Sequence, residues 1–289
     1  MLSGLTDESA ALNLFTRIPV AAAQTRLPII SALPTAYFVN GDTGLKQTTE
    51  VNWANKYLNI EELAAIVPIP EAVLDDVGFD VWGQVRPLVE QAIGRAVDAA
   101  VFFGTNAPAS WPVGIVPSAV AAGNVVARGT NAATAGGIVG DLSAVFGTVE
   151  ADGYDPDGLA ANRTLRGALR NARSTAGESL DGAFEAELRD LATYPLRGLW
   201  PTGLSAAEAI AFQRDQFVVG VRQDFTYKVL DQAVIQDNTG AIIYNLAQQD
   251  MVAMRVTFRV GWQAANTINY DQGTEASRYP AGVLRSPAA

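Results

Sequence analysis

The segment over residues 80–104, DVWGQVRPLVEQAIGRAVDAAVFFG, constrains the fold most, because its apolar residues recur three and four positions apart. This spacing places them on one face of a helix. The carboxylate of Asp80 can cap the first turn, and Gly104 can adopt the left-handed conformation that ends a helix. Pro87 lacks an N–H, so we expect either a kink near Gly83 or a helix that starts at Pro87. The pattern predicts one helix of about 36 Å against a core.

The composition is that of a folded protein with a surface poor in charge. The 289 residues are 49% hydrophobic, which can fill one or two cores, whereas only 17% are charged. We therefore expect partners to cover part of the surface. The first residues lack the pattern of a signal peptide, and no apolar run approaches the length of about 20 residues that spans a bilayer. We expect no membrane partner.

The formal charge of −10 argues against tight binding of nucleic acid, because phosphate binding needs lysine and arginine. The chain has only three lysines, Lys46, Lys56 and Lys228. An acidic surface near DNA would repel it, which is useful only where DNA must not adhere.

The residue types restrict the possible chemistry. Without histidine and cysteine, the chain has no catalytic triad, no thiol nucleophile and no ordinary zinc site, and the absence of cysteine suits a reducing cytoplasm. Carboxylates remain, and Glu185, Glu187 and Asp190 lie close enough in sequence for a hydrolase, although this spacing is also typical of a solvated helix face. The glycine-bearing sequences DPDG and GGIVG lack the remaining residues of a calcium loop and of a phosphate loop. We expect no enzyme, no cofactor and no metal.

One basic pattern occurs in NRTLRGALRNAR. Its arginines are spaced so that a helix would gather all four along one side. They are Arg163, Arg166, Arg170 and Arg173. Such a face is typical of a solvated surface paired with acidic neighbours, or of a contact to a neighbouring subunit or to nucleic acid phosphate.

The N-terminal part indicates extended structure. Pro19, Pro28 and Pro34 interrupt every helical run in residues 1–36, which predicts an extended arm. A strand, a polar glycine-bearing tip over residues 41–50 and a second extended run follow. A two-stranded excursion of this size is marginal alone in water, so we expect it to lie on a partner subunit.

The rest of the chain predicts a mixed α+β fold. Helix and strand signals alternate over residues 137–215, and long strands follow from Gln216. Within residues 250–267, DMVAMRVTFRVGWQAANT, alternation places one set of side chains on an apolar face and another on a polar face. The apolar set is Met254, Val256, Phe258 and Val260, and the polar set is Arg255, Thr257 and Arg259.

Three stretches in this order resemble the major capsid proteins of tailed double-stranded DNA phages, the Hong Kong 97-like fold family. Residues 64–104 are similar to the passage from the extended loop into the spine helix. Residues 153–173, GYDPDGLAANRTLRGALRNAR, resemble the strand and helix of the axial domain. FVVGVRQDFTYKVLDQA and NLAQQDMVAMRVTFRVGWQAANT resemble the closing strands of the peripheral domain.

The resemblance implies a division of the chain and a function. The implied parts are an N-terminal arm (residues 1–36), an extended loop (37–66), a peripheral domain with the spine helix (67–111), an axial domain (112–215), closing strands (216–270) and a C-terminal segment (271–289). The implied function is self-assembly as hexamers and pentamers into an icosahedral shell around a phage genome, made in the host cytoplasm. The implied partners are a scaffolding protein, a portal protein, a decoration protein and packaged DNA in weak non-specific contact.

Two further properties of the family bear on this chain. Some members link subunits through a lysine on the extended loop and an asparagine; Lys46 lies in the tip, and Asn266 and Asn269 lie late in the chain. In those members a buried glutamate acts as the base, and no motif here marks that glutamate or the asparagine, so we expect an unlinked shell. Some members begin with a long helical scaffolding segment that is cleaved off, whereas only about 36 residues precede the extended loop here. Either a separate scaffolding protein is used or the chain is already mature, and Met1 favours the separate protein. An encapsulin, a compartment of the same fold that holds an enzyme, remains the alternative.

Overall fold

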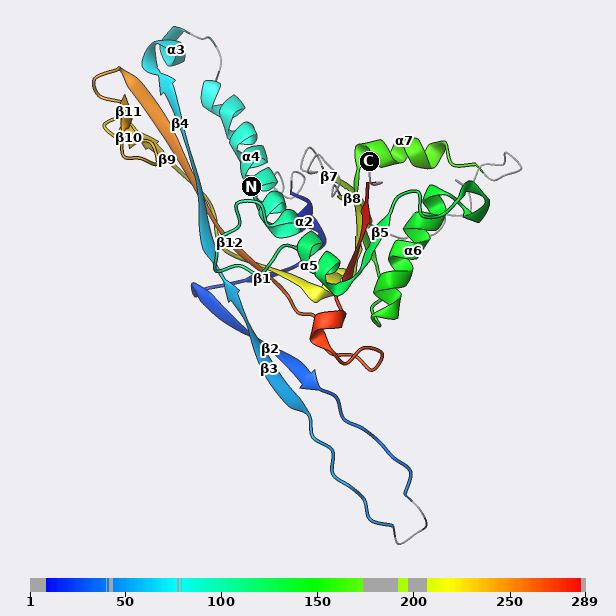
Figure 1. The fold of residues 1–289 in the computed structure, drawn as a ribbon. Helices are drawn as coiled ribbons and strands as arrows, with labels where there is room; N and C mark the ends of the chain where they lie inside the picture. Colours follow the sequence, from blue (N-terminus) through cyan, green and yellow to red (C-terminus); the bar gives the residue numbers. More distant parts are fainter. Residues whose placement is uncertain are drawn as a thin grey trace.

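The computed structural model describes residues 9–173, 192–196 and 207–286, apart from residues 40, 42, 43, 77 and 79. Figure 1 shows two sheets with helices packed on them and a long two-stranded hairpin that projects from the body. The helices are α2 (Ala10–Leu14), α3 (Glu71–Asp76), α4 (Val81–Phe103), α5 (Ile115–Ala122), α6 (Ile138–Ala151) and α7 (Arg163–Arg170), with 3-10 turns η1 (Ala133–Ala135), η2 (Arg214–Gln216) and η3 (Glu275–Ser277). Within the described ranges, none of these helices is long and apolar enough to cross a membrane.

The strands form two larger sheets and two hairpins. They are β1 (Thr16–Pro19), β2 (Gln24–Ala32), β3 (Asn52–Asn59), β4 (Glu61–Pro70), β5 (Val125–Ala127), β6 (Gly158–Asn162), β7 (Ala192–Leu196), β8 (Ala207–Phe212), β9 (Phe217–Leu230), β10 (Val234–Gln236), β11 (Ile242–Asn245), β12 (Met251–Ala264) and β13 (Ala281–Arg285). The first sheet has the order β1-β9-β12-β4 and the second β5-β13-β8-β6-β7, while β10-β11 and β2-β3 pair separately.

Strand β12 lies between β9 and β4 and pairs antiparallel with both. The predicted alternation is confirmed, since Met254, Val256, Phe258 and Val260 are buried while Arg255 is exposed. Their side chains pack in one core with residues of α4, which lies along this sheet (Figure 1). Burial of one face of a long strand thus holds the helix and the sheet together.

Helix α4 is the long helix that the sequence predicts. Oδ1 of Asp80 accepts the N–H of Gly83 at 3.0 Å, and Gly104 ends the helix with φ of 69°. The helix is continuous through Pro87, so the alternative start at Pro87 is wrong. Pro87 supplies no N–H to the carbonyl of Gly83, a loss close to the helix start, where few helical bonds precede it.

The N-terminal segment differs from the expected extended arm, because Ala10, Ala11, Leu12, Leu14 and Phe15 lie in the core. The ring centroid of Phe15 lies 5.7 Å from Phe102 of α4, 5.4 Å from Phe212 of β8 and 5.0 Å from Phe217 of β9. Strand β1 then joins the first sheet as the parallel neighbour of β9. Phe15 therefore joins α4 to both sheets. The sequence did not predict α2, because a helix of five residues is too short to give a periodic pattern.

Asp98 ties this segment to α4 from the buried side of the helix. Its Oδ1 accepts the hydroxyl of Ser9 at 2.7 Å and the N–H of Ala11 at 2.9 Å, while Oδ2 accepts the N–H of Ala10 at 2.9 Å. Burial raises the pKa of Asp98 to about 6, although the three hydrogen bonds oppose this shift. The carboxylate thus satisfies the free donors at the start of α2.

The second sheet includes β13 (Ala281–Arg285), which lies within the range 271–289 that we expected to be a separate C-terminal segment. Strand β13 runs parallel to β5 and antiparallel to β8, and Val283 and Leu284 are buried. Helix α6 packs on this sheet through Leu142 and Val145. A short strand whose partners lie far away in sequence carries no local signal of its place in a sheet.

The hairpin is also placed differently from the expected extended loop over residues 37–66. Its ladder runs from the pair Gln24 and Asn59 to the pair Ala32 and Asn52. Strand β4, of which the sequence interpretation placed residues 61–66 in the loop, instead pairs over its whole length with β12 in the first sheet. The hairpin therefore begins earlier and ends earlier than expected, and the described residues between 33 and 51 form the far part beyond its ladder (Figure 1).

Two glycines let the root of the hairpin cross the first sheet. Gly220 of β9 and Gly261 of β12 are paired in register. A Cβ on Gly261 would overlap the carbonyl oxygen of Asn59, and a Cβ on Gly220 would overlap the side chain of Leu58, which is itself buried. The root can lie flat on the strands only because both positions lack a side chain.

Substitution of Gly261 by alanine is expected to lower the free energy of unfolding by about 1–3 kcal/mol, because backbone has to move to admit the methyl group. Urea unfolding followed by circular dichroism measures this change. Gly147 in α6 is a matched control, since a Cβ there meets nothing within 4 Å. Gly147→Ala should raise the free energy of unfolding by up to about 1 kcal/mol. Equal effects at the two positions would contradict the packing argument.

Candidate inter-subunit contact surfaces

The far part of the hairpin exposes large apolar side chains that an isolated chain would normally bury. Phe38 is fully exposed and Leu45 nearly so, and Tyr37 and Val39 are more than a third exposed. Two hydrogen bonds join the two sides of its described residues: the N–H of Thr35 donates to Oγ1 of Thr49 at 2.9 Å, and the hydroxyl of Tyr37 donates to the carbonyl of Gln47. A two-stranded ribbon of this kind is marginal in water, so it is suited to packing on another surface.

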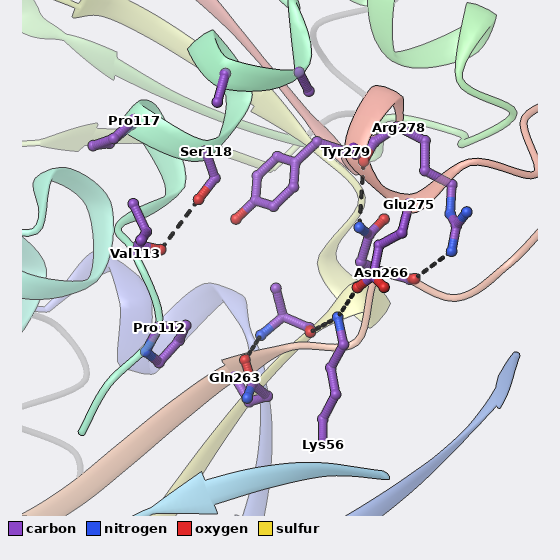
Figure 2. Close-up of a pocket in the computed structure, with 14 residues that line it drawn as sticks. Lys56, Pro112, Val113, Pro117, Ser118, Gln263, Asn266, Glu275, Arg278 and Tyr279 are labelled. Carbon is purple, nitrogen blue, oxygen red and sulfur yellow. Dashed lines mark hydrogen bonds and ion pairs between the residues drawn. The ribbon is translucent and has the colours of Figure 1, made fainter. Parts of the chain in front are cut away.

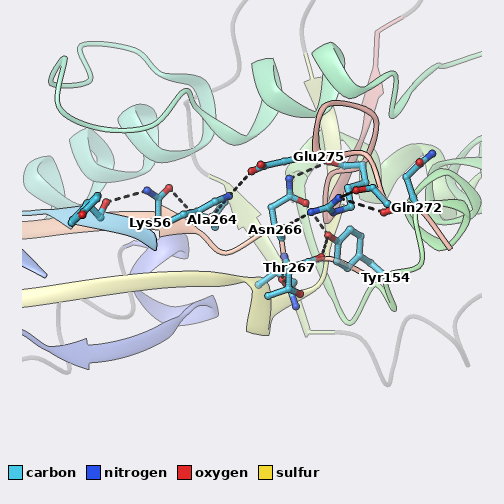
Figure 3. Close-up of polar contacts among 12 residues, drawn as sticks. Lys56, Tyr154, Ala264, Asn266, Thr267, Gln272 and Glu275 are labelled. Atoms are coloured by element: carbon cyan, nitrogen blue, oxygen red, sulfur yellow. Dashed lines mark hydrogen bonds and ion pairs between the residues drawn. The ribbon is translucent and has the colours of Figure 1, made fainter. Parts of the chain in front are cut away.

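The root of the hairpin is fixed to the body by polar contacts from three segments (Figure 3). Nζ of Lys56 lies 3.0 Å from Oε1 of Glu275 and donates to the carbonyl of Ala264 at 3.2 Å. Nε2 of Gln263 donates to the carbonyl of Tyr57 at 3.0 Å, and the indole N–H of Trp111 donates to the carbonyl of Asn59 at 3.1 Å. These contacts set the direction in which the hairpin leaves the body.

A buried polar network supports the segment that carries Glu275. The hydroxyl of Tyr154 lies 2.8 Å from both Oδ1 of Asn266 and the carbonyl oxygen of Thr267. Arg278 is buried and donates to the carbonyl oxygens of Gly273 at 2.8 Å and Asn266 at 3.2 Å. Asn266 has φ of 46°, a left-handed conformation that asparagine tolerates. The network holds the turn after β12 in place (Figure 3).

A cavity of about 320 Å³ opens between the root of the hairpin, α5 and this turn (Figure 2). Its apolar wall comes from Pro112, Val113 and Pro117, and Lys56 and Glu275 lie at its edge. Figure 2 shows the ring of Tyr279 pointing its hydroxyl towards the cavity. Tyr279 is only 7% exposed, and its hydroxyl is buried beside the side chain of Ser118.

The four arginines of the basic pattern do not all lie on one helix. Helix α7 contains Arg163, Arg166 and Arg170, but it ends at Arg170, so Arg173 follows it. Nη1 of Arg173 donates to the carbonyl oxygens of Arg170 and Ala172, both at 2.9 Å, which satisfies carbonyls at the helix end. Arg170 and Arg173 are exposed, whereas the side chains of Arg163 and Arg166 lie outside the described part. A role of these arginines in subunit or DNA contact remains a prediction.

The lysine and the two asparagines considered for a crosslink lie in different parts of the structure. Lys46 is exposed in the far part of the hairpin. Asn266 is buried in the network, and Nδ2 of Asn269 donates to the carbonyl oxygen of Asp152 at 2.6 Å. Both asparagines thus support the body. Glu185, Glu187 and Asp190, the carboxylates considered for a hydrolase, lie outside the described residues.

Sequence reasoning missed Lys56, Glu275, Asp98 and Tyr279 as residues that position these surfaces. Lys56 and Glu275 lie far apart in sequence, so no spacing pattern connects them. Asp98 gives the one usable signal, because it lies between Val97 and Ala99 on a helix whose second half is mostly apolar. A carboxylate buried in such a stretch needs hydrogen-bond donors from another segment.

The comparisons with known proteins agree with this architecture. The model of the phage capsid family matches residues 1–267. A solved structure from Microbacterium phage Oxtober96 is 37% identical, with a TM-score of 0.83, and the match covers 96% of this chain and 91% of that chain. A structure from Mycobacterium phage Cain is 33% identical, with a TM-score of 0.85, and covers 98% of this chain and 91% of that chain.

A curated relative is named as a major capsid protein. It comes from Staphylococcus phage 80alpha and is 23% identical over 271 residues, which is 92% of this chain and 79% of that protein. The mixed helix and sheet fold with a long helix and a projecting hairpin defines a Hong Kong 97-like shell subunit. The chain belongs to the phage capsid family and is a major capsid protein of the tailed-phage type. It assembles with itself, and its place is the capsid of the virion.

Proposed function

We propose that this chain forms hexamers and pentamers that close into an icosahedral shell around double-stranded DNA. The observation that carries this proposal is the hairpin, whose exposed apolar residues lie beyond a ladder that is joined to the body by polar contacts at its root. Such a projection gains stability only when it is buried between chains, and many such contacts in a closed shell reinforce one another. We assign a structural role and no catalytic activity.

We further propose how the parts of the chain divide in the shell. The first sheet with α4 forms the peripheral domain, and the second sheet with α6 and α7 forms the axial domain. Strand β13 then belongs to the axial domain, although the sequence resemblance implied a separate C-terminal segment. This division follows the two sheets, and α6 and α7 share a core with the second sheet.

The partners proposed beyond the chain itself follow from its charge and from the family. A net charge of −10 disfavours adhesion to DNA, so contact with the packaged genome is weak and non-specific, with the region of Arg170 and Arg173 as a contact point. Assembly in the host cytoplasm with a scaffolding protein, a portal protein and a decoration protein completes the proposal. The encapsulin alternative gains no support, since the family and the relatives quoted above are those of phage capsids.

Electron microscopy of the purified chain, with a denaturing gel beside it, tests this proposal. Closed shells tens of nanometres across, with one band at the monomer mass of 30.5 kDa, are expected for a shell held by noncovalent contacts. A ladder of multimers on the gel would contradict the unlinked shell and would direct attention to Lys46. Chains that stay monomeric, alone and after co-expression with the scaffolding protein, would contradict the shell itself.

A further inference from the structure

The face of the first sheet opposite to α4 carries two cations that are not paired with any described residue. Helix α4 packs against the Met254 side of β12, so Arg255 and Arg259 lie on the other side (Figure 1). Arg255 of β12 pairs in register with Lys228 of β9. Both side chains are exposed, and neither makes an ion pair or a hydrogen bond with a residue that the structure describes.

The pairing of β9, β12 and β4 arranges this basic sheet face in three rows. Across the strands, the rows are Lys228–Arg255–Ile66, Thr226–Thr257–Ala64 and Gln223–Arg259–Glu62. Glu62 supplies the carboxylate of these rows, and its Oε2 accepts hydrogen bonds from Nη2 and Nε of Arg259 at 2.6 and 2.8 Å. Ile66 is 44% exposed in the row of Lys228 and Arg255. The two cations therefore lie beside an exposed apolar side chain.

A pair of cations in register on neighbouring strands costs free energy in the isolated chain. The Cβ atoms of directly opposed residues lie about 4.5–5.5 Å apart, and like charges at this separation are destabilising. The chain has only 20 lysines and arginines against 30 aspartates and glutamates, so acidic residues that could neutralise the pair are abundant in it. A carboxylate placed between Lys228 and Arg255 would accept hydrogen bonds from both and remove their repulsion. The pair is therefore suited to an acidic partner from outside the chain.

The charge of the basic sheet face also indicates on which side of a shell it lies. DNA packed inside a shell has to move along the wall, and unpaired cations on that wall would hold its phosphates. The basic sheet face is therefore suited to the outer surface, where the genome is absent. Ile66 supports this assignment, because an apolar group beside two cations matches a protein surface better than a phosphate backbone.

We propose that the basic sheet face binds an acidic decoration protein on the outside of the shell. The inference rests on the proposed shell function, and it names the surface and the chemistry of one partner. That partner presents a carboxylate to Lys228 and Arg255 and an apolar side chain to Ile66. Charge complementarity speeds the association, and the contact at Ile66 excludes water from the neighbouring ion pairs.

Cosedimentation of closed shells with a labelled polyglutamate peptide of about 20 residues tests this surface, because the peptide presents carboxylates without phosphate. The test variant combines Lys228→Gln with Arg255→Gln. The matched control combines Arg95→Gln with Arg285→Gln, which removes the same charge from two other exposed cations. Electron microscopy first checks that each variant forms closed shells. Duplex DNA of similar total charge is the second probe, and both probes are used at low ionic strength, where screening is weakest.

Wild-type and control shells are expected to bind the peptide equally, and the test variant about fivefold less, because two exposed ion pairs are lost. The difference should vanish in about 1 M salt, where exposed charges are screened over a few ångströms. Equal binding by all three shells at low ionic strength would overturn the docking proposal and leave the shell function intact.

Three other outcomes would also overturn the proposal. A test variant that no longer closes into shells would show that the basic sheet face contacts other copies of the chain. Tighter binding of the duplex than of the peptide, lost in the test variant, would assign the face to nucleic acid. Wild-type chains that form no shells under the same conditions would overturn both the docking proposal and the shell function.

Discussion

Deletion of residues 41–50 is expected to leave a soluble, folded chain that no longer closes into normal shells. These residues lie beyond the β2-β3 ladder, and those that the structure describes there are largely exposed, so the deletion removes little of the core. The deletion removes contacts between chains. A closed shell depends on these contacts, because many of them form at once and together strengthen the assembly. Sedimentation of the purified variant, with electron microscopy of the heavy fractions, measures the loss of closed particles.

The control for this deletion is the stability of the isolated chain. Urea unfolding of the deleted and wild-type chains should agree within about 1 kcal/mol, because surface changes away from packed features have small effects. A large fall in stability would mean that the far part of the hairpin packs on its own body. Normal shells from the deleted chain would contradict the assignment of the hairpin as the contact between subunits.

Replacement of Asp98 by alanine is expected to destabilise the chain by about 2–4 kcal/mol. The hydroxyl of Ser9 and the N–H groups of Ala10 and Ala11 would lose their acceptor, and a buried donor without a partner costs about 1–3 kcal/mol. Helix α2 would detach from α4 before the free-energy cost of three unpaired donors is reached in full, and this detachment limits the loss of stability. Urea unfolding of Asp98→Ala, compared with Ser9→Ala, measures the effect. Ser9→Ala should cost less, since it removes one of the three donors.

The pH dependence of this group has a definite sign. Burial raises the pKa of Asp98 from 3.8 to about 6, so between these values the folded chain holds a proton that the unfolded chain has released. Its contribution to stability is full below pH about 4 and is lost as the pH rises through about 6. The stability advantage of wild type over Asp98→Ala should therefore shrink between these values and stay constant above them. An advantage that grows with pH would contradict the raised pKa.

Local patterns in the sequence predicted the elements whose signals are local. Helix α4 was recognised from its spacing, and both of its caps, Asp80 and Gly104, were identified because each acts on neighbouring backbone. The alternation around Val256 in β12 was equally clear, since one face of that strand is buried over its length. In both elements the periodicity extends over many residues, which makes the pattern reliable.

The elements that the sequence did not place depend on distant partners. Helix α2 is too short to be periodic and is held by Asp98, while β13 gains its place from β5 and β8. The cavity is the clearest case, because Lys56, Val113 and Tyr279 come from three separate segments. Local propensity carries no information about which segments will meet, so a site of this kind emerges only from the folded chain.

Because the hairpin root packs over Gly220 and Gly261, a small change in packing there alters the direction of the whole hairpin. Its root is clamped against two strands, so the ribbon and the first sheet turn together. Over an arm of about 35 Å, a tilt of roughly 5° at the root displaces Phe38 by about 3 Å. If successive copies are joined through their hairpins, a change of a few tenths of an ångström in packing over these glycines becomes a different angle between neighbours. The curvature of the shell would then depend on two positions at which glycine has no side chain.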